Sequence, residues 1–287
     1  MKTRIPSAAL VLASLVLVVL NVAVFTHLYQ PQTANLTVSF LDVGQGDAIL
    51  IEGPTGIEML IDGGKDRSVL RELPRVMGPL DRSIDVVVAT HPDADHIGGL
   101  PGVLSRYSVG WFFEPGKEGE SSMYESLVVA VDRERGIEEG MLRNGMRIHL
   151  GGGAYADILH PEENVAQLRE TNDASIMMRV VYGETEFMLT GDAPSWVEDR
   201  VVRRYGSIIQ SDVLKAGHHG SKTSTSPAFL AAVDPGVVVV SAGKDNSYGH
   251  PHQDVVARIL ESGATLVSTI TEGTITFVSD GKEVVQK

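Results

Sequence analysis

The sequence predicts one α/β domain in which sheets and helices pack as layers. Short strand-like runs alternate with helical segments from Leu36 to the C-terminus, and no linker, internal repeat or low-complexity tract interrupts them. Apolar residues make up 43% of the chain and charged residues 21%, which is ordinary for a globular protein. A chain of 287 residues could form one large domain or two small ones, and the absence of a linker favours one.

The expected strands are short apolar or alternating runs bounded by glycine turns. They cover 36–43, 47–53, 57–64, 85–90, 146–150, 155–160, 175–182, 185–192, 212–220, 235–243, 264–270 and 273–280. The expected helices carry apolar residues at helical spacing. They cover 98–107, 123–135, 194–205, 227–233 and 253–260.

The first residues differ from the rest of the chain. Lys2 and Arg4 precede an almost unbroken apolar stretch of 18 residues, from Ala8 to Phe25, which is long enough to span a bilayer. No small-x-small site follows, so an uncleaved anchor is favoured over a cleaved signal peptide. We therefore expect a single-pass transmembrane anchor at 1–27, a linker at 28–35 and a domain at 36–287. Since the basic residues stay cytoplasmic, that domain would lie outside the cytoplasm at the cell membrane, and cleavage would make it secreted.

Composition limits the chemistry. The chain has no cysteine, so any metal must be held by histidines and carboxylates. Its 24 basic and 37 acidic residues give a net charge of −13. Proteins that bind nucleic acid non-specifically usually carry an excess of basic residues, and this chain has no such excess overall. Arg200, Arg203 and Arg204 form a local basic cluster, which we interpret as a solvated helix face.

Six of the nine histidines occur in three short motifs, each at or just after a predicted strand end, where rigid sheets commonly present metal ligands and catalytic groups. The motifs contain His91 and His96, His218 and His219, and His250 and His252. In the segment THPDADH we expect an extended loop on which His91, Asp93 and Asp95 converge while His96 turns the other way. That geometry suits two metal ions about 4 Å apart.

Two further positions carry candidate groups. Asp192 ends an apolar strand, where a carboxylate is costly unless it is paired or metal-bound, so it is either a bridging ligand or the N-cap of the next helix. Of His218 and His219, one could be a ligand and the other a proton donor or phosphate contact.

The order of motifs resembles the metallo-β-lactamase fold, and more narrowly the extracytoplasmic hydrolase domain of the ComEC family of DNA-uptake channels. The motifs are FLDVGQGDAILI, LIDGG, THPDADHIGG, LTGD, LKAGHHGSKTSTSP and GKDNSYGHPH, and together they cover nearly all of 36–287. The superfamily pattern is His-x-His-x-Asp-His. Asp93 fills the second position here, as in the ComEC-like branch. The resemblance implies an αββα sandwich with a two-metal site.

The resemblance also implies roles for individual residues. His91 and Asp93 would hold one metal and Asp95 and His96 the other, with Asp192 as the bridge. The late ligand histidine would be His250, with His252 as its rival. Where an intermediate histidine is usual, this chain offers Asp173 or Asn172, and we interpret His160, the nearest upstream histidine, as structural. The implied catalytic set is Asp95, His218 and His219.

The implied cofactors are two divalent metal ions, Zn²⁺ or Mn²⁺, which would lower the pKa of a water molecule and polarise the attacked oxygen. Asp93 in place of an imidazole shifts the preference towards Mn²⁺. We expect a metallo-hydrolase, a phosphodiesterase or nuclease acting on DNA, single-stranded DNA in particular, outside the cytoplasm. The alternatives are a phosphocholine-esterase-like enzyme for smaller phosphodiesters and a non-catalytic tethered module that binds DNA-uptake proteins. β-Lactam hydrolysis is disfavoured, and the sequence predicts no oligomeric state.

Overall fold

The computed structural model describes residues 14–19, 35–78, 80–162 and 164–287. The chain divides into two units, 1–33 and 34–287, and residues 14–19 of the first are helical. The predicted anchor at 1–27 and linker at 28–35 lie mostly outside the described residues. Within the described ranges, no helix is long and apolar enough to cross a membrane.

Residues 34–287 contain two β-sheets. The eight-stranded sheet has the order β15-β14-β1-β2-β3-β4-β5-β6, and the seven-stranded sheet has the order β13-β12-β11-β10-β9-β8-β7. The strands of the first sheet are β1 (Leu36–Phe40), β2 (Ile49–Glu52), β3 (Glu58–Ile61), β4 (Ser83–Val88), β5 (Ser108–Glu114), β6 (Glu138–Met141), β14 (Ile275–Ser279) and β15 (Val284–Gln286). Those of the second are β7 (Arg147–Gly151), β8 (Ala154–His160), β9 (Met177–Tyr182), β10 (Thr185–Leu189), β11 (Val213–Lys215), β12 (Val237–Val240) and β13 (Thr265–Ser268).

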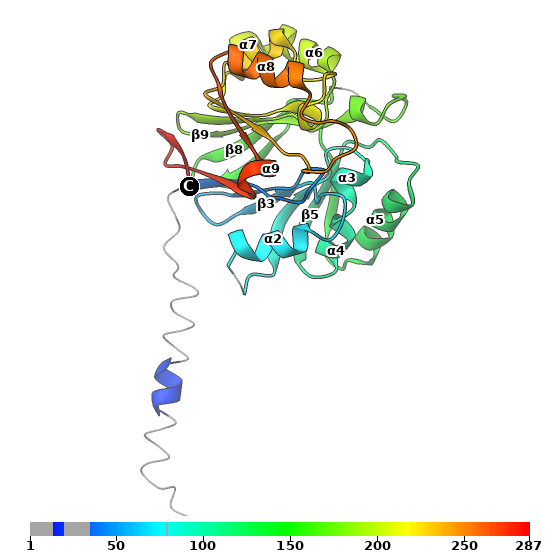
Figure 1. Cartoon of the computed structure of the whole chain (residues 1–287). Coiled ribbons are helices and arrows are strands. Elements are labelled where there is room, and N and C mark those ends of the chain that lie inside the picture. The colour runs from blue at the N-terminus through cyan, green and yellow to red at the C-terminus, as the bar shows by residue number, and fades with distance from the viewer. Residues whose placement is uncertain (1–13, 20–34, 79, 163) are drawn as a thin grey trace, which may run out of the picture. The chain divides into compact units, whose positions relative to one another are not determined.

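Helices cover the outer face of each sheet, so the layers run helix, sheet, sheet, helix (Figure 1). On the first sheet lie α2 (Val69–Val76), α3 (Ala94–Ile97), α4 (Leu100–Leu104) and α5 (Ser122–Arg133). On the second lie α6 (Ser195–Tyr205), α7 (Pro227–Val233) and α8 (Gln253–Glu261), while the short α9 (Thr269–Glu272) precedes β14. The predicted αββα sandwich is confirmed.

The core explains this layering, because the buried apolar residues fall into three clusters. One joins the two sheets and includes Phe40, Phe187 and Phe277, whose rings meet edge to face at 6.0 and 6.3 Å. The other two pack α2–α5 and α6–α8 onto the outer faces. A strand that is covered on both sides has no polar face, which is why β12 reads as four consecutive valines.

The same end of the sandwich receives the carboxyl ends of several strands. Strands β3 to β6 run parallel, and so do β10 to β13. The loops after β3, β4, β10, β11 and β12 carry the sequence motifs, which therefore meet although they are far apart in the chain.

Candidate metal centre

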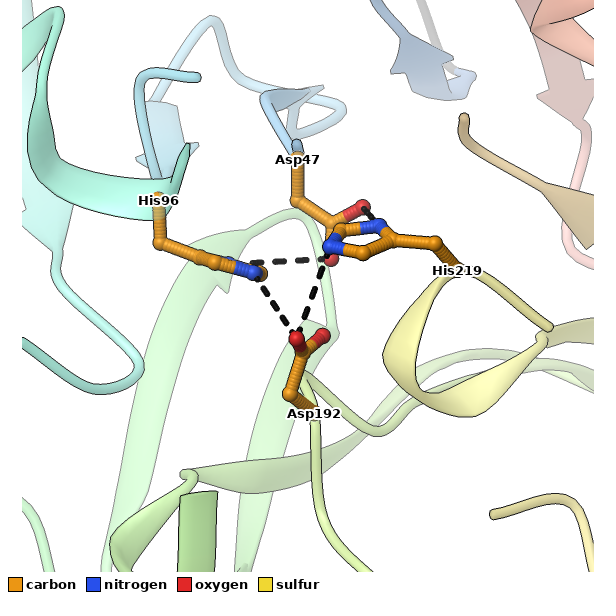
Figure 2. A group of neighbouring side chains, drawn as sticks. All are labelled: Asp47, His96, Asp192 and His219. Atoms are coloured by element: carbon orange, nitrogen blue, oxygen red, sulfur yellow. Dashed lines mark ion pairs between the residues drawn. The ribbon is translucent and has the colours of Figure 1, made fainter. Parts of the chain in front are cut away.

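Four side chains from distant parts of the chain converge on one point. They are Asp47, His96, Asp192 and His219, all buried, and each offers one ligand atom within 4.8 Å of the others. Figure 2 shows them pointing towards one another from four separate segments. Asp47 lies between β1 and β2, His96 on α3, Asp192 after β10, and His219 in a 3₁₀ turn after β11.

Asp192 lies in the middle of four histidine side chains. Its Oδ2 atom lies 3.3 Å from Nε2 of His96, 3.4 Å from Nε2 of His219, 3.6 Å from Nε2 of His218 and 3.9 Å from Nε2 of His91. A bridging ligand requires such a central position. The bridging role itself stays a prediction.

Partners on the far side of each ring orient two of these histidines. Nδ1 of His96 lies 2.7 Å from Oδ2 of Asp62, and since a carboxylate only accepts, the proton resides on Nδ1. Asp62 is in turn fixed by the backbone N–H and the hydroxyl of Thr90, both at 2.8 Å. Nδ1 of His219 donates to the carbonyl oxygen of Ser241 at 3.0 Å. Both arrangements leave Nε2 facing the cluster, as in metal-binding histidines.

Most of the converging atoms have no hydrogen-bond partner. Nε2 of His91, His96 and His219 and Oδ1 of Asp47 and Asp192 are buried without one, whereas Oδ2 of Asp47 pairs with a buried lysine. Each buried polar atom left in this way costs about 1–3 kcal/mol. A divalent cation would satisfy these nitrogens and carboxylate oxygens together, so the residues present fit a metal ion.

A buried lysine adds a fixed positive charge. Nζ of Lys215 lies 2.6 Å from Oδ2 of Asp47 and 3.9 Å from Oδ1 of Asp192, and it donates to the carbonyl oxygen of Gly191 at 3.2 Å. Burial alone would lower the pKa of Lys215, but the two carboxylates outweigh burial and raise it. Burial likewise opposes ionisation of Asp47, yet Lys215 and His219 lower the pKa of Asp47 to about 2.

Two histidines are held neutral. Burial, followed by the neighbouring His96, lowers the pKa of His91 to about 4. Burial, followed by His218 and His219, lowers the pKa of His250 to about 4. Neutral imidazole is the form that binds a metal, so both side chains are ready to act as ligands at pH 7.

The THPDADH segment folds differently from the expectation. The backbone N–H groups of His96 and Ile97 donate to the carbonyl oxygen of Asp93 at 2.9 and 3.0 Å, which closes the first turn of α3. That turn brings the His96 ring to 4.1 Å from the His91 ring, so the prediction of an extended loop with His96 turned away is wrong. Asp93 lies 3.7 Å from Nε2 of His91.

Asp95, on α3, contacts a different histidine from Asp93. Its Oδ2 atom lies 3.3 Å from Nε2 of His219. The two carboxylates of the segment therefore face opposite halves of the cluster, Asp93 towards His91 and Asp95 towards His219.

Asp173 is not among the four residues whose ligand atoms converge. Its carboxylate accepts a hydrogen bond from Nε1 of Trp196 at 2.9 Å, and its carbonyl oxygen lies 2.9 Å from Nε2 of His160. His160 is thus engaged in a structural contact. The adjacent Asn172 lies nearer the site, with Nδ2 at 3.5 Å from Nδ1 of His218. A ligand role for Asp173 stays a prediction.

The structure separates His250 from its rival His252. The His250 ring lies 5.5 Å from the His218 ring and 6.4 Å from the His219 ring. Nδ1 of His252 instead accepts a hydrogen bond from the backbone of Asp254 at the start of α8. Proximity therefore favours His250 as the ligand, although its coordination stays a prediction.

Three residues at or next to the cluster were not predicted as site residues from the sequence. Asp47 and Asp62 lie within motifs quoted above, and Lys215 precedes the histidine pair. Asp62 carried a signal, since it follows β3 as Asp192 follows β10, whereas Asp47 lies two residues before β2. Asp192 itself does not cap α6, whose N-cap is Pro194, so that alternative is excluded.

Comparison with known proteins identifies relatives of the same kind. The chain is 29% identical to ComE operon protein 3 of Bacillus subtilis over 84% of its length, and 29% identical to competence protein ComA of Neisseria gonorrhoeae over 87%. It is 30% identical to recombination protein 2 of Haemophilus influenzae over 95%. The matched segments are 32%, 33% and 32% of these proteins, so the chain spans about a third of their length. The resemblance to ComEC-like proteins is confirmed.

Solved structures share the fold at low sequence identity. Igni18, a metallo hydrolase from Ignicoccus hospitalis, matches with a TM-score of 0.54 at 16% identity, covering 85% of this chain and 98% of its own. CmlA, a diiron β-hydroxylase from Streptomyces venezuelae, matches with a TM-score of 0.53 at 15% identity, covering 84% and 53%. The model of the metallo-beta-lactamase superfamily matches residues 41–244. The chain therefore belongs to the metallo-beta-lactamase superfamily.

Proposed function

We propose that this protein is a metal-dependent phosphodiesterase of the ComEC-like branch and that it acts as a nuclease. The observation that carries the proposal is the convergence of buried, unsatisfied histidine and aspartate atoms around Asp192. Divalent metal ions bound there supply Lewis acidity and lower the pKa of a water molecule. The relatives named for competence and recombination favour nucleic acid as the substrate.

Each residue has a role in this proposal. Asp47, His96 and His219 would hold a metal ion together with Asp192, and His91 would extend the site to a second ion. Because carboxylates stand beside the imidazoles in this site, its preference shifts towards Mn²⁺ compared with a site built mainly from histidines. Zn²⁺ is the alternative ion.

His218 faces the substrate in this proposal. Its side chain is 29% exposed, whereas that of the adjacent His219 is buried. Burial lowers the pKa of His218, and the neighbouring His219 and Lys215 lower it further, while the charge of Asp192 acts in the opposite direction. The net effect is a lowered pKa, so the imidazole is neutral at pH 7. The amide of Asn172 lies 3.5 Å from Nδ1, and Nε2 lies 3.6 Å from Oδ2 of Asp192, so the neutral ring would donate Nε2–H to a phosphoryl oxygen bound beside Asp192.

The test is cleavage of DNA by the purified 287-residue chain. We expect degradation of single-stranded DNA with Mn²⁺ or Zn²⁺, abolition by chelation, and a large loss in Asp192→Asn. Asp199→Asn, on the following helix α6, serves as the matched control and should retain activity. If neither DNA nor RNA is cleaved with either metal, the nuclease proposal is refuted.

A second candidate is hydrolysis of a smaller phosphodiester by the same groups. The net charge of −13 favours it, because a polyanionic substrate is repelled by an acidic protein. Hydrolysis of bis-p-nitrophenyl phosphate while DNA stays intact would support this candidate. A chain that folds but binds no metal would instead support the non-catalytic module. The location outside the cytoplasm stays a prediction.

A further inference from the structure

An exposed tyrosine lies beside the metal centre. Tyr248 belongs to the loop between β12 and α8, and the residue is 65% exposed. Its ring stacks on that of His250, with centroids 5.7 Å apart and planes at 20°. The His250 ring lies 5.5 Å from His218 and 6.4 Å from His219. One imidazole therefore separates this exposed aromatic ring from the residues of the cluster.

One asparagine organises the loop that carries Tyr248. Nδ2 of Asn246 donates to the carbonyl oxygens of Gly243 at 2.7 Å and His250 at 2.6 Å. Its Oδ1 accepts from the backbone N–H groups of Tyr248 at 3.2 Å and His250 at 2.9 Å. These four hydrogen bonds hold the backbone on both sides of Tyr248. A ring positioned in advance loses less entropy when a ligand binds.

We propose that Tyr248 is a substrate-binding residue that stacks on a nucleobase next to the phosphodiester to be cleaved. This inference rests on the proposed nuclease function and specifies its substrate as nucleic acid with unpaired bases. Aromatic rings stack on any base, whereas the bases of a duplex already stack on each other. A phosphocholine headgroup has no flat ring to stack on Tyr248 and would contact it through a cation–π interaction instead, so dependence of binding on bases distinguishes the two substrates.

The charge of the protein makes a contribution of this kind necessary for nucleic acid to bind. A net charge of −13 opposes the approach of a nucleic-acid backbone. Stacking needs no positive charge, so it can supply binding free energy that electrostatics does not supply here.

The experiment compares a short oligothymidylate with an abasic strand of the same length. Binding to the 287-residue chain is followed by fluorescence anisotropy in EDTA, and cleavage is followed in Mn²⁺. Tyr248→Ala should weaken binding of oligothymidylate and raise its KM about 5- to 150-fold, with the abasic strand unaffected. Tyr248→Phe keeps the ring and should behave as wild type.

A control variant tests whether any exposed aromatic ring has this effect. Trp111 is 40% exposed but lines a cavity to which none of the cluster residues contributes, so Trp111→Ala should leave binding unchanged. Asn246→Ala should reproduce part of the Tyr248→Ala effect, because it loosens the loop.

The outcomes separate this inference from the proposed function. Wild-type binding that does not depend on bases overturns the role of Tyr248, and so does an equal loss on both strands in Tyr248→Ala. Base-dependent binding that Tyr248→Ala weakens, without cleavage of either strand, supports Tyr248 and contradicts only the nuclease proposal.

Discussion

The substitution Lys215→Met tests whether a fixed cation balances the carboxylates of the metal centre. The side chain of Lys215 is 1% exposed, and its ammonium lies 2.6 Å from an oxygen of Asp47 and 3.9 Å from an oxygen of Asp192. Methionine has a similar length and no charge, so the variant leaves both buried carboxylates without this partner. We expect the variant to be less stable without metal and to gain more stability than wild type when metal is added.

The magnitude follows from the burial of the ion pair. Removing one partner of a buried pair costs about 3–5 kcal/mol, because the other charge stays buried. In a domain of this size each kcal/mol shifts the Tm by about 2–4 °C, so the Tm in EDTA should fall by about 6–20 °C. A metal ion present at 100 times its Kd stabilises a protein by about 2.7 kcal/mol. The more anionic variant binds the ion more tightly, so its gain should exceed that of wild type.

The assay is thermal unfolding followed by circular dichroism, in EDTA and in Mn²⁺, for wild type and for Lys215→Met. The control Lys222→Met removes an exposed lysine from the segment that follows the histidine pair and should unfold as wild type does. If the Lys215→Met and Lys222→Met proteins have the same Tm in EDTA, Lys215 does not balance the carboxylates and the reasoning is refuted.

Three further predictions concern the residues around the centre. Gly46→Ala should lower the free energy of unfolding in urea by at least about 3 kcal/mol, since its Cβ would lie 2.0 Å from the carbonyl oxygen of Asp95 at a φ of +125°. Gly44→Ala, at a φ of +76° with open space, should cost about 1–2 kcal/mol, and equal costs would contradict the clash. Burial raises the pKa of Glu198 to about 7, so the stability that its neutral carboxyl contributes is present below about pH 4.5 and is lost as the pH rises to 7. The free energy of unfolding in urea should therefore fall by about 3 kcal/mol more in wild type than in Glu198→Gln between these two pH values. The same pH dependence in both proteins would disprove this. Asp47→Asn should weaken Mn²⁺ binding at least about tenfold by calorimetry, and unchanged affinity would remove Asp47 from the ligand set.

The sequence predicted the layers of the fold better than their short elements. Strands buried on both faces, such as β4 and β12, are continuous apolar runs that need no context to be recognised. The helix α3 has four residues, too few for a helical period to show, whereas α4 lies within the helix expected at 98–107. The edge strand β15 has three residues and lacks a buried one, so its pairing with β14 leaves no pattern in the sequence.

The candidate site was predicted unevenly for a similar reason. Histidines are rare in this chain and cluster in motifs, so their grouping was visible. Aspartates and lysines are common surface residues, and Asp47 and Lys215 differ from the others only through contacts across more than 160 positions. Asp173 was predicted as a ligand from its spacing before Asp192. Spacing does not reveal that the carboxylate of Asp173 accepts a hydrogen bond from Trp196.

The backbone of the histidine pair explains how adjacent residues can have different environments. His218 and His219 both adopt left-handed conformations, with φ of 50° and 55°, which cost roughly 1–2 kcal/mol each for non-glycine residues. The N–H of His218 donates to the carbonyl oxygen of Gly191, and the carbonyl oxygen of His218 accepts from Ser221, so hydrogen bonds on both sides hold the turn. The strained turn buries the His219 ring against Asp192 and leaves His218 part-exposed, with the two ring planes 75° apart. A regular strand would direct these side chains to opposite faces of the sheet. The strained turn therefore places His219, the proposed ligand, beside His218, the proposed substrate-facing group, and holds both next to Gly191, the residue that precedes Asp192.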